Sequence, residues 1–96
     1  MREFRFNVDQ ETGQSHIYDH GVSEIEVEQV FQNRPETRPR NKRNTRIAMG
    51  KTHGGRYLKV IYIPDEDGIG IYVITAYDLR GKPLHAHRRR MRRRFR

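Results

Sequence analysis

Two histidines near the end of the chain, His85 and His87, have the side chains best suited to proton transfer near neutral pH. They stand at the start of an arginine-rich run that could hold an RNA backbone within their reach. Metal-independent RNA cleavage needs a base for the 2′-hydroxyl proton, a cation beside the phosphorane and an acid for the leaving oxygen. Because residues i and i+2 of a helix point in different directions, we expect at most one of the two to be catalytic. The alternative is that both belong to a solvated basic surface.

Three further cations, Arg46, Arg56 and Lys59, are expected on adjacent strands, where they could converge on one face of a sheet. Guanidinium groups bind phosphate through paired hydrogen bonds, so this cluster is a candidate phosphate clamp, with surface solubility as the alternative. Tyr77, at the end of a predicted strand, could stack on an unpaired base or donate a proton, and simple packing is its alternative. We therefore take Arg46, Arg56, Tyr77 and His85 as candidate catalytic residues.

Positive charge is concentrated at one end of the sequence. Nine of the twenty Lys and Arg residues lie within residues 80–96, which contain no Asp or Glu. Residues 1–79 hold eleven Lys and Arg against twelve Asp and Glu, so the net charge of +8 comes from the last segment. We expect it to bind nucleic acid, while an acidic protein, an anionic membrane and a solvated tail are the alternatives. The predicted nucleic-acid-binding residues are Lys59, Lys82, His87, Arg88, Arg89, Arg90, Arg92, Arg93 and Arg94.

Two other motifs carry less weight. His16 and His20 have the i, i+4 spacing that can place two imidazoles on one metal ion, but no third ligand is apparent. We therefore predict no metal site and no cofactor. Gly54 and Gly55 precede no predicted helix that could present its N-terminus to an anion, so we expect a turn there and not a phosphate loop.

The strands that must position these residues are indicated by alternating apolar side chains. They are predicted at residues 2–8, 45–50, 56–63 and 69–77, and the last is apolar or aromatic on both faces, as in a central strand. Residues 34–46 contain six Lys and Arg, one acid and two prolines, which suits an exposed loop or an edge strand.

The helices are indicated by local capping signals. Ser23 and Glu26 have the spacing of a capping box, which predicts the start of a helix, and a shorter helical segment is expected over residues 15–20. Residues 80–96 are expected to form a last, basic helix with proline in its first turn. Its apolar side would carry Leu84, Met91 and Phe95. The predicted fold is α+β: an N-terminal strand, two short helices, an antiparallel meander in one sheet and a basic C-terminal helix.

Length and composition suit a small cytoplasmic protein. The 96 residues are enough for a single domain, with a body over residues 1–79 and the basic helix or tail over residues 80–96. The absence of cysteine fits a reducing compartment. The first residues do not resemble a signal peptide, and no stretch has the length and apolarity needed to span a bilayer, so we expect no membrane association.

Most of the body resembles the BrnT family of bacterial type II toxins, relatives of the RelE ribonucleases, in two stretches: HIYDHGVSEIEVEQVF and RIAMGKTHGGRYLKVIYIPDEDGIGIYVITAYDLRGK. The family shows an H-G-V-S helix start, an R-x-x-x-x-G strand and an I-I-S-A-R strand end. The positions that align are His20, Gly21, Val22, Ser23, Arg46, Gly50, Arg56 and Tyr62. At the strand end this chain has Thr75, Ala76 and Tyr77 instead, and Arg80 is the candidate replacement for the family's arginine, which completes the catalytic set.

The resemblance implies a RelE-like fold and the toxin component of a type II toxin–antitoxin system. Such a toxin is a metal-independent endoribonuclease that inhibits translation by cutting RNA, including ribosome-associated mRNA. The resemblance also implies a cognate antitoxin of the ribbon-helix-helix type and a hetero-oligomer with it. The alternative is a small basic protein that binds nucleic acid or the ribosome without cleavage.

Overall fold

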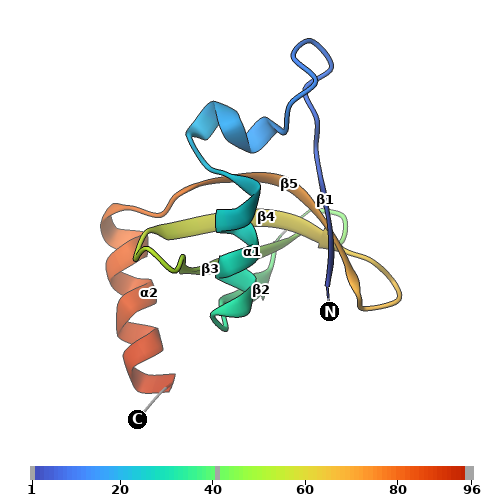
Figure 1. The fold of residues 1–96 in the computed structure, drawn as a ribbon. Coiled ribbons are helices and arrows are strands. Elements are labelled where there is room, and N and C mark those ends of the chain that lie inside the picture. Colours follow the sequence, from blue (N-terminus) through green and yellow to red (C-terminus); the bar gives the residue numbers. More distant parts are fainter. Residues whose placement is uncertain (1, 41, 95–96) are drawn as a thin grey trace.

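The computed structural model describes residues 2–40 and 42–94, which form one five-stranded mixed sheet with two α-helices (Figure 1). The elements follow in the order β1 (Glu3–Phe6), the 3-10 helix η1 (His16–His20), α1 (Glu24–Gln32), β2 (Glu36–Pro39), β3 (Arg46–Lys51), β4 (Tyr57–Pro64), β5 (Gly70–Asp78) and α2 (Gly81–Arg94). The predicted α+β class, the N-terminal strand and the C-terminal helix are confirmed.

The sheet has the strand order β1-β5-β4-β3-β2. Strands β2 to β5 form an antiparallel meander, whereas β1 pairs in parallel with β5, from Glu3 opposite Gly70 to Phe6 opposite Val73. The sequence of residues 34–46 was compatible with either an exposed loop or an edge strand. Part of this segment forms the edge strand β2. The meander therefore has four strands where the sequence predicted three.

The predicted capping box starts α1. The Ser23 hydroxyl accepts a hydrogen bond from the Glu26 amide (3.2 Å), and Glu26 Oε1 accepts one from the Ser23 amide (3.0 Å). Just before it, Gly21 ends η1 with a φ of 69°, a left-handed conformation that glycine adopts without steric penalty. These two local signals redirect the chain, so that α1 lies across the sheet (Figure 1).

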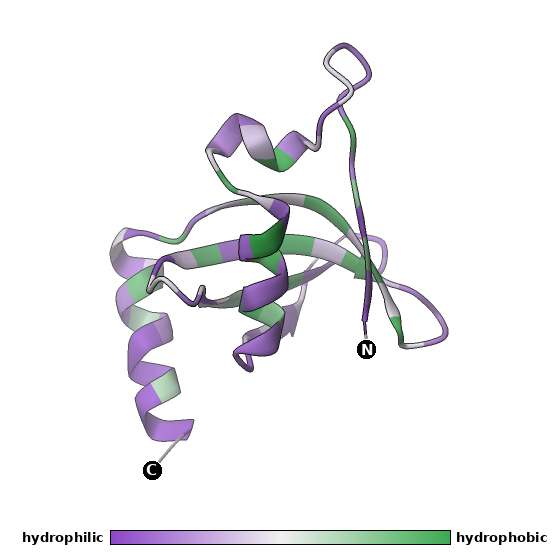
Figure 2. Ribbon diagram, in the orientation of Figure 1, coloured by the Kyte–Doolittle hydropathy of each residue, from purple (hydrophilic) through white to green (hydrophobic). Residues whose placement is uncertain are grey.

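The main core lies between α1 and one face of the sheet. The buried residues of α1 are Val27, Val30 and Phe31, and they share one core cluster with buried residues of the strands. In contrast, α2 is polar along most of its length (Figure 2). The ring of Phe31 in α1 packs edge-on against Tyr62 of β4 with centroids 5.1 Å apart, and lies 5.5 Å from Phe4 of β1. One aromatic side chain thus joins three elements that are far apart in sequence.

The second face of the sheet meets the start of α2. Met49 and Lys59 pair across β3 and β4 and point away from the main core under α1, because their neighbours along the strands belong to that core. These neighbours are Ala48, Leu58 and Val60. Pro83, Ala86 and Arg90 of α2 lie beside them in a shallow groove. Figure 1 shows α2 leaving the end of β5 and running past the neighbouring ends of β3 and β4.

On the predicted apolar side of α2, Leu84 and Met91 are half-buried, and Phe95 lies outside the described residues. None of the helices within residues 2–40 and 42–94 is both long and apolar enough to cross a bilayer.

Replacing Phe31 by Ala is expected to lower the free energy of unfolding by about 3–5 kcal/mol, because the substitution leaves a cavity among the joined elements. Urea denaturation followed by circular dichroism measures it. Ile25→Ala is the matched control on the same helix, since Ile25 is 66% exposed and should change stability by less than about 1 kcal/mol. Equal losses for the two variants would contradict this description of the core.

Candidate functional site

One carboxylate, that of Glu36 on the edge strand β2, holds α2 to the body. Its Oε1 accepts hydrogen bonds from His87 Nδ1 (2.8 Å) and Arg90 Nη2 (3.0 Å). Its Oε2 accepts from Arg90 Nε and from Arg38 Nη2 (3.1 Å). A single side chain therefore binds two residues of the helix and one of its own strand.

These contacts keep Glu36 ionised. Burial raises the pKa of the carboxyl, but hydrogen bonds from Arg90 and His87 outweigh burial and lower the pKa from 4.5 to about 2. An ionised carboxylate has no proton to donate, so its bond with His87 requires a proton on Nδ1 of the imidazole. A ring with a single proton then carries its lone pair on Nε2, the nitrogen turned away from Glu36. Glu36 thereby selects the tautomer of a histidine that is only 1% exposed.

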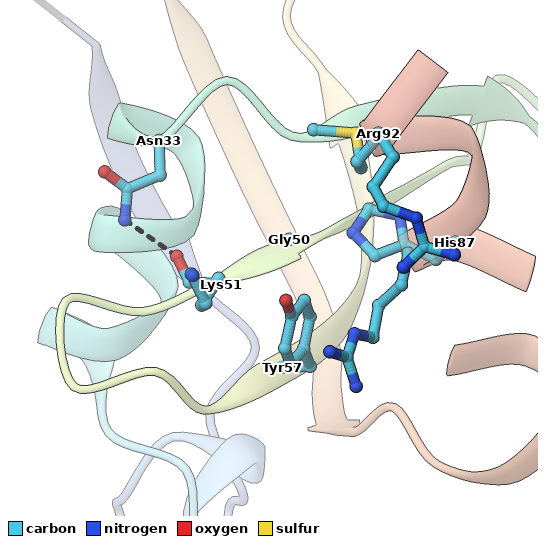
Figure 3. A pocket seen from close by; sticks show the side chains of 8 residues that line it. Asn33, Gly50, Lys51, Tyr57, His87 and Arg92 are labelled. Atoms are coloured by element: carbon cyan, nitrogen blue, oxygen red, sulfur yellow. Dashed lines mark hydrogen bonds between the residues drawn. The ribbon is translucent and has the colours of Figure 1, made fainter. Parts of the chain in front are cut away.

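A groove with a volume of about 560 Å³ lies where α2 passes the ends of β3 and β4 (Figure 3). Tyr57, the first residue of β4, stands between Lys51 and the side chains of α2. The Lys51 Nζ and the Arg88 Cζ lie 5.8 and 5.9 Å from the centroid of its ring. The His87 ring meets it edge-on with centroids 5.8 Å apart. The lining residues are Asn33, Gly50, Lys51, Tyr57, His87, Arg88, Met91 and Arg92.

The cations at the rim of this groove differ from the other cations of the fold. Within the described residues, Lys51, Arg88 and Arg92 form no ion pair with a carboxylate, whereas Arg56 and Arg90 both do. The groove therefore combines an aromatic ring, an oriented imidazole and cations that are not neutralised within the fold. Together these groups can bind the base and the phosphate of a nucleotide.

Arg56, a predicted catalytic residue, is engaged with the fold. Its Nε donates to Asp78 Oδ1 (2.6 Å), and its Nη1 donates to Glu26 Oε1 (3.1 Å) and to the Gly21 carbonyl oxygen (2.8 Å). The hydrogen bond from Arg56 lowers the pKa of Asp78. Burial raises the pKa of Glu26, but hydrogen bonds from Ser23 and Arg56 outweigh this and lower it. Arg56 thus ties the end of β5 to the start of α1.

The predicted convergence of Arg46, Arg56 and Lys59 is wrong, because the strand register separates them. Arg46 pairs with the core residue Tyr62 and so starts on the face that α1 covers. Lys59 pairs with Tyr77 on the opposite face. Arg56 precedes β4 and turns toward α1. The phosphate clamp expected from these three residues therefore does not form.

Tyr77 is placed away from the groove but beside two other groups. The Lys59 Nζ lies 5.8 Å from the centroid of its ring, and the His20 ring lies 5.8 Å from it, centroid to centroid. Tyr77 and Lys59 are half-buried and His20 is exposed, so the three form a cluster at the surface of the molecule, where η1 lies beside β5.

Arg80 and His85 are exposed. The side chain of Arg80 is 81% exposed, and its Nη2 donates to Asp78 Oδ2 (2.7 Å). His85 lies on the surface of α2, while His87, two residues later, is buried, so the two imidazoles do not act on one site. Neither Arg80 nor His85 lines the groove of Figure 3.

The predicted nucleic-acid-binding residues of α2 fall into two groups. Arg90 binds Glu36, and Arg94 Nη1 donates to the carbonyl oxygens of Arg34 (3.2 Å) and Pro35 (3.3 Å), so these two and His87 face the body. Arg94 is nevertheless exposed, as are the remaining members, which an external anion can reach: Lys82, Arg88, Arg89, Arg92 and Arg93.

The rings of His16 and His20 lie 5.7 Å apart in η1. Among the described residues, no group of three or more His, Cys, Asp or Glu side chains is arranged to hold a metal ion.

Comparison with known families identifies the body of the chain. Residues 14–78 match the family described as domain of unknown function DUF4258. This chain belongs to the DUF4258 family. No curated protein and no solved structure matches it. The DUF4258 segment runs from just before η1 to the end of β5, so it includes Glu36 and Tyr57 but not α2. The groove is thus built between the DUF4258 body and a basic helix that follows it.

Sequence reasoning missed Glu36, Lys51 and Tyr57 as site residues of this DUF4258 protein. Glu36 had a visible signal, because it is the one acid among the six cations of residues 34–46. A lone acid in a basic segment is a candidate for a buried ion pair. Lys51 and Tyr57 had no comparable signal, since their proximity to Arg88 depends on how α2 docks.

Stability is expected to depend on pH through Glu36. Because its pKa is depressed in the folded state, its contribution is present above about pH 4.5 and is lost as the pH falls toward about 2. Glu36→Gln should therefore lower the free energy of unfolding at pH 7 by about 1–3 kcal/mol and flatten this acid-dependent part. Urea denaturation at several pH values measures both effects. Glu66→Gln, at an exposed position in the turn before β5, should keep the wild-type pH dependence.

Arg56→Ala should act through folding. It leaves the carboxylates of Glu26 and Asp78 without their shared guanidinium, at an expected cost of about 1–3 kcal/mol. Arg80→Ala is the matched control, because Arg80 binds the same Asp78 but is exposed, and should cost less than about 1 kcal/mol. Thermal unfolding compares the two variants. If they lower the Tm equally, Arg56 does not have the structural role described.

Proposed function

We propose that this DUF4258 protein is the RNA-cleaving toxin of a bacterial type II toxin–antitoxin system, acting in the cytoplasm to inhibit translation. One observation carries the proposal: a histidine oriented by an ionised carboxylate lines a groove whose rim holds cations with no carboxylate partner within the described residues. These groups supply two of the three requirements of metal-independent RNA cleavage, the base and the cations beside the phosphorane, and solvent supplies the acid. The resemblance of the body to BrnT toxins supports the same function.

In this proposal, neutral His87 is the general base. Its Nε2 takes the proton of a 2′-hydroxyl, and the 2′-oxygen forms a bond to the adjacent phosphorus while the bond to the 5′-oxygen breaks. The leaving oxygen takes a proton from solvent, so the products carry a 2′,3′-cyclic phosphate and a 5′-hydroxyl. Arg88 and Arg92 stabilise the negative charge on the phosphorane. Glu36 is a positioning residue, since it holds the proton on Nδ1 and stabilises the imidazolium that forms.

The biological partners belong to the same proposal. The substrate is RNA, including ribosome-associated mRNA, and the exposed cations of α2 hold its backbone. A ribbon-helix-helix antitoxin would silence the toxin by forming a hetero-oligomer with it, as the BrnT resemblance implies.

A specific observation favours the alternative of RNA or ribosome binding without cleavage. His87 is 1% exposed, so in the free protein its ring serves mainly to dock α2. Cleavage requires RNA to displace rim side chains until Nε2 can reach a 2′-hydroxyl. If that displacement does not occur, the exposed cations still bind a polyanion and nothing is cut.

The deciding experiment expresses the chain from a tightly controlled promoter in bacteria and maps RNA 5′ and 3′ ends before and after induction. New ends with growth arrest are expected from the wild type. His87→Gln, whose amide can still donate to Glu36, should reduce cleavage by about 100-fold or more. His53→Ala, an exposed histidine outside the groove, should cut as the wild type does.

Purified wild-type protein and the variants His87→Gln, His85→Ala and His53→Ala are then assayed in the presence of EDTA. Cleavage that persists in His87→Gln but disappears in His85→Ala would transfer the catalytic role to His85. Intact RNA in cells that accumulate folded wild-type protein would replace the toxin proposal by the binding alternative.

A further inference from the structure

We propose that Tyr57 is the stacking platform for one unpaired base of single-stranded RNA, whose flanking phosphates bind Lys51, Arg88 and Arg92. The inference rests on the RNA-binding part of the proposed function, but it does not require cleavage.

The ring of Tyr57 is held in a defined position and is half-buried. Its backbone carbonyl accepts a hydrogen bond from the Leu79 amide (3.0 Å), and its ring edge meets buried His87. Met91 adds an apolar side chain to the same groove. A fixed ring with an apolar neighbour provides a flat surface onto which a base can stack with little loss of side-chain entropy.

The cations beside the ring indicate that the ligand carries phosphate. Lys51 and Arg88 lie 5.8 and 5.9 Å from the ring centroid, at the outer limit of a cation–π contact. Because these contacts are weak, Lys51 and Arg88 can exchange them for stronger, charge-assisted hydrogen bonds to phosphate. Arg92 follows Arg88 by one helical turn on α2, so the two guanidinium groups lie on the same side of the helix. A base on Tyr57 would therefore place its phosphates among three cations.

The geometry favours a single strand over a duplex. In duplex RNA both faces of a base are stacked on its neighbours, so no face is available to an aromatic side chain. The groove volume of about 560 Å³ lies within the range of small-molecule sites and suits one splayed nucleotide.

The chain contains no tryptophan, so Y57W would introduce a single fluorescent reporter at the platform. Decamers of 2′-O-methyl uridine and 2′-O-methyl adenosine serve as ligands, because they lack the 2′-hydroxyl that cleavage consumes. Saturable quenching of Y57W fluorescence is expected with both decamers. A ribose-phosphate decamer without bases should not quench it. Y18W, with its reporter in η1 outside the groove, should show no quenching with any ligand.

Affinity measured by fluorescence anisotropy of labelled decamers provides the second readout. Tyr57→Ala is expected to weaken binding by about 5- to 100-fold, and Tyr57→Phe, which keeps the ring, by no more than about twofold. For the decamer without bases, wild type and Tyr57→Ala should bind alike. Circular dichroism of each variant checks that the strand still forms.

Equal affinity of wild type and Tyr57→Ala for the uridine and adenosine decamers would overturn the platform and leave only electrostatic binding. If uridine monophosphate quenches Y57W at the same concentration as the decamer does, the platform is also overturned, because that result indicates a pocket for a free nucleotide. Absence of RNA binding would remove both the platform and the proposed function. Quenching by the decamers without RNA cleavage in cells would support the platform and reject the catalytic part alone.

Discussion

The attachment of α2 depends on one ionised carboxylate. The helix is basic along its length and has little apolar surface with which to pack, so it cannot be held by hydrophobic burial alone. Glu36 neutralises Arg90 and orients His87 from the edge strand β2. Arg38, on the same strand, binds the same carboxylate. Without this contact the groove beside Tyr57 would lose one wall. The edge strand β2 therefore positions the candidate site as well as closing the sheet.

Ion pairing separates structural cations from those available to a ligand. Arg56 bridges Glu26 and Asp78, and Arg90 binds Glu36, so these guanidinium groups are already engaged in the fold. Among the described residues, the cations at the groove rim, Lys51, Arg88 and Arg92, form no ion pair with an acid. Lys51 and Arg88 lie beside the ring of Tyr57 instead. A guanidinium that already has its carboxylate has less to gain from a phosphate than one that lacks a carboxylate. This difference assigns the candidate site more clearly than the total charge of the segment.

The parts of the fold that could be predicted from the sequence have local physical causes. The capping box of Ser23 and Glu26 involves residues three apart, and alternation along β1 reports which strand face is buried. The parallel pairing of β1 with β5 gave no comparable signal, because it joins Glu3 to Gly70 across most of the chain. In the candidate site, too, only the local feature was visible in the sequence. His87 was recognisable as a titratable group, but its partner Glu36 lies 51 residues away.

The sequence by itself determined the α+β class, the concentration of positive charge in residues 80–96 and the presence of histidines there. These follow from composition and short-range periodicity. Only the tertiary structure decided that Arg46 and Lys59 lie on opposite faces of the sheet, and that Tyr57 and Lys51 meet the basic helix. The physical reason is that strand register and helix docking are set by contacts between distant residues. A shift of one residue in such pairing would exchange the two faces.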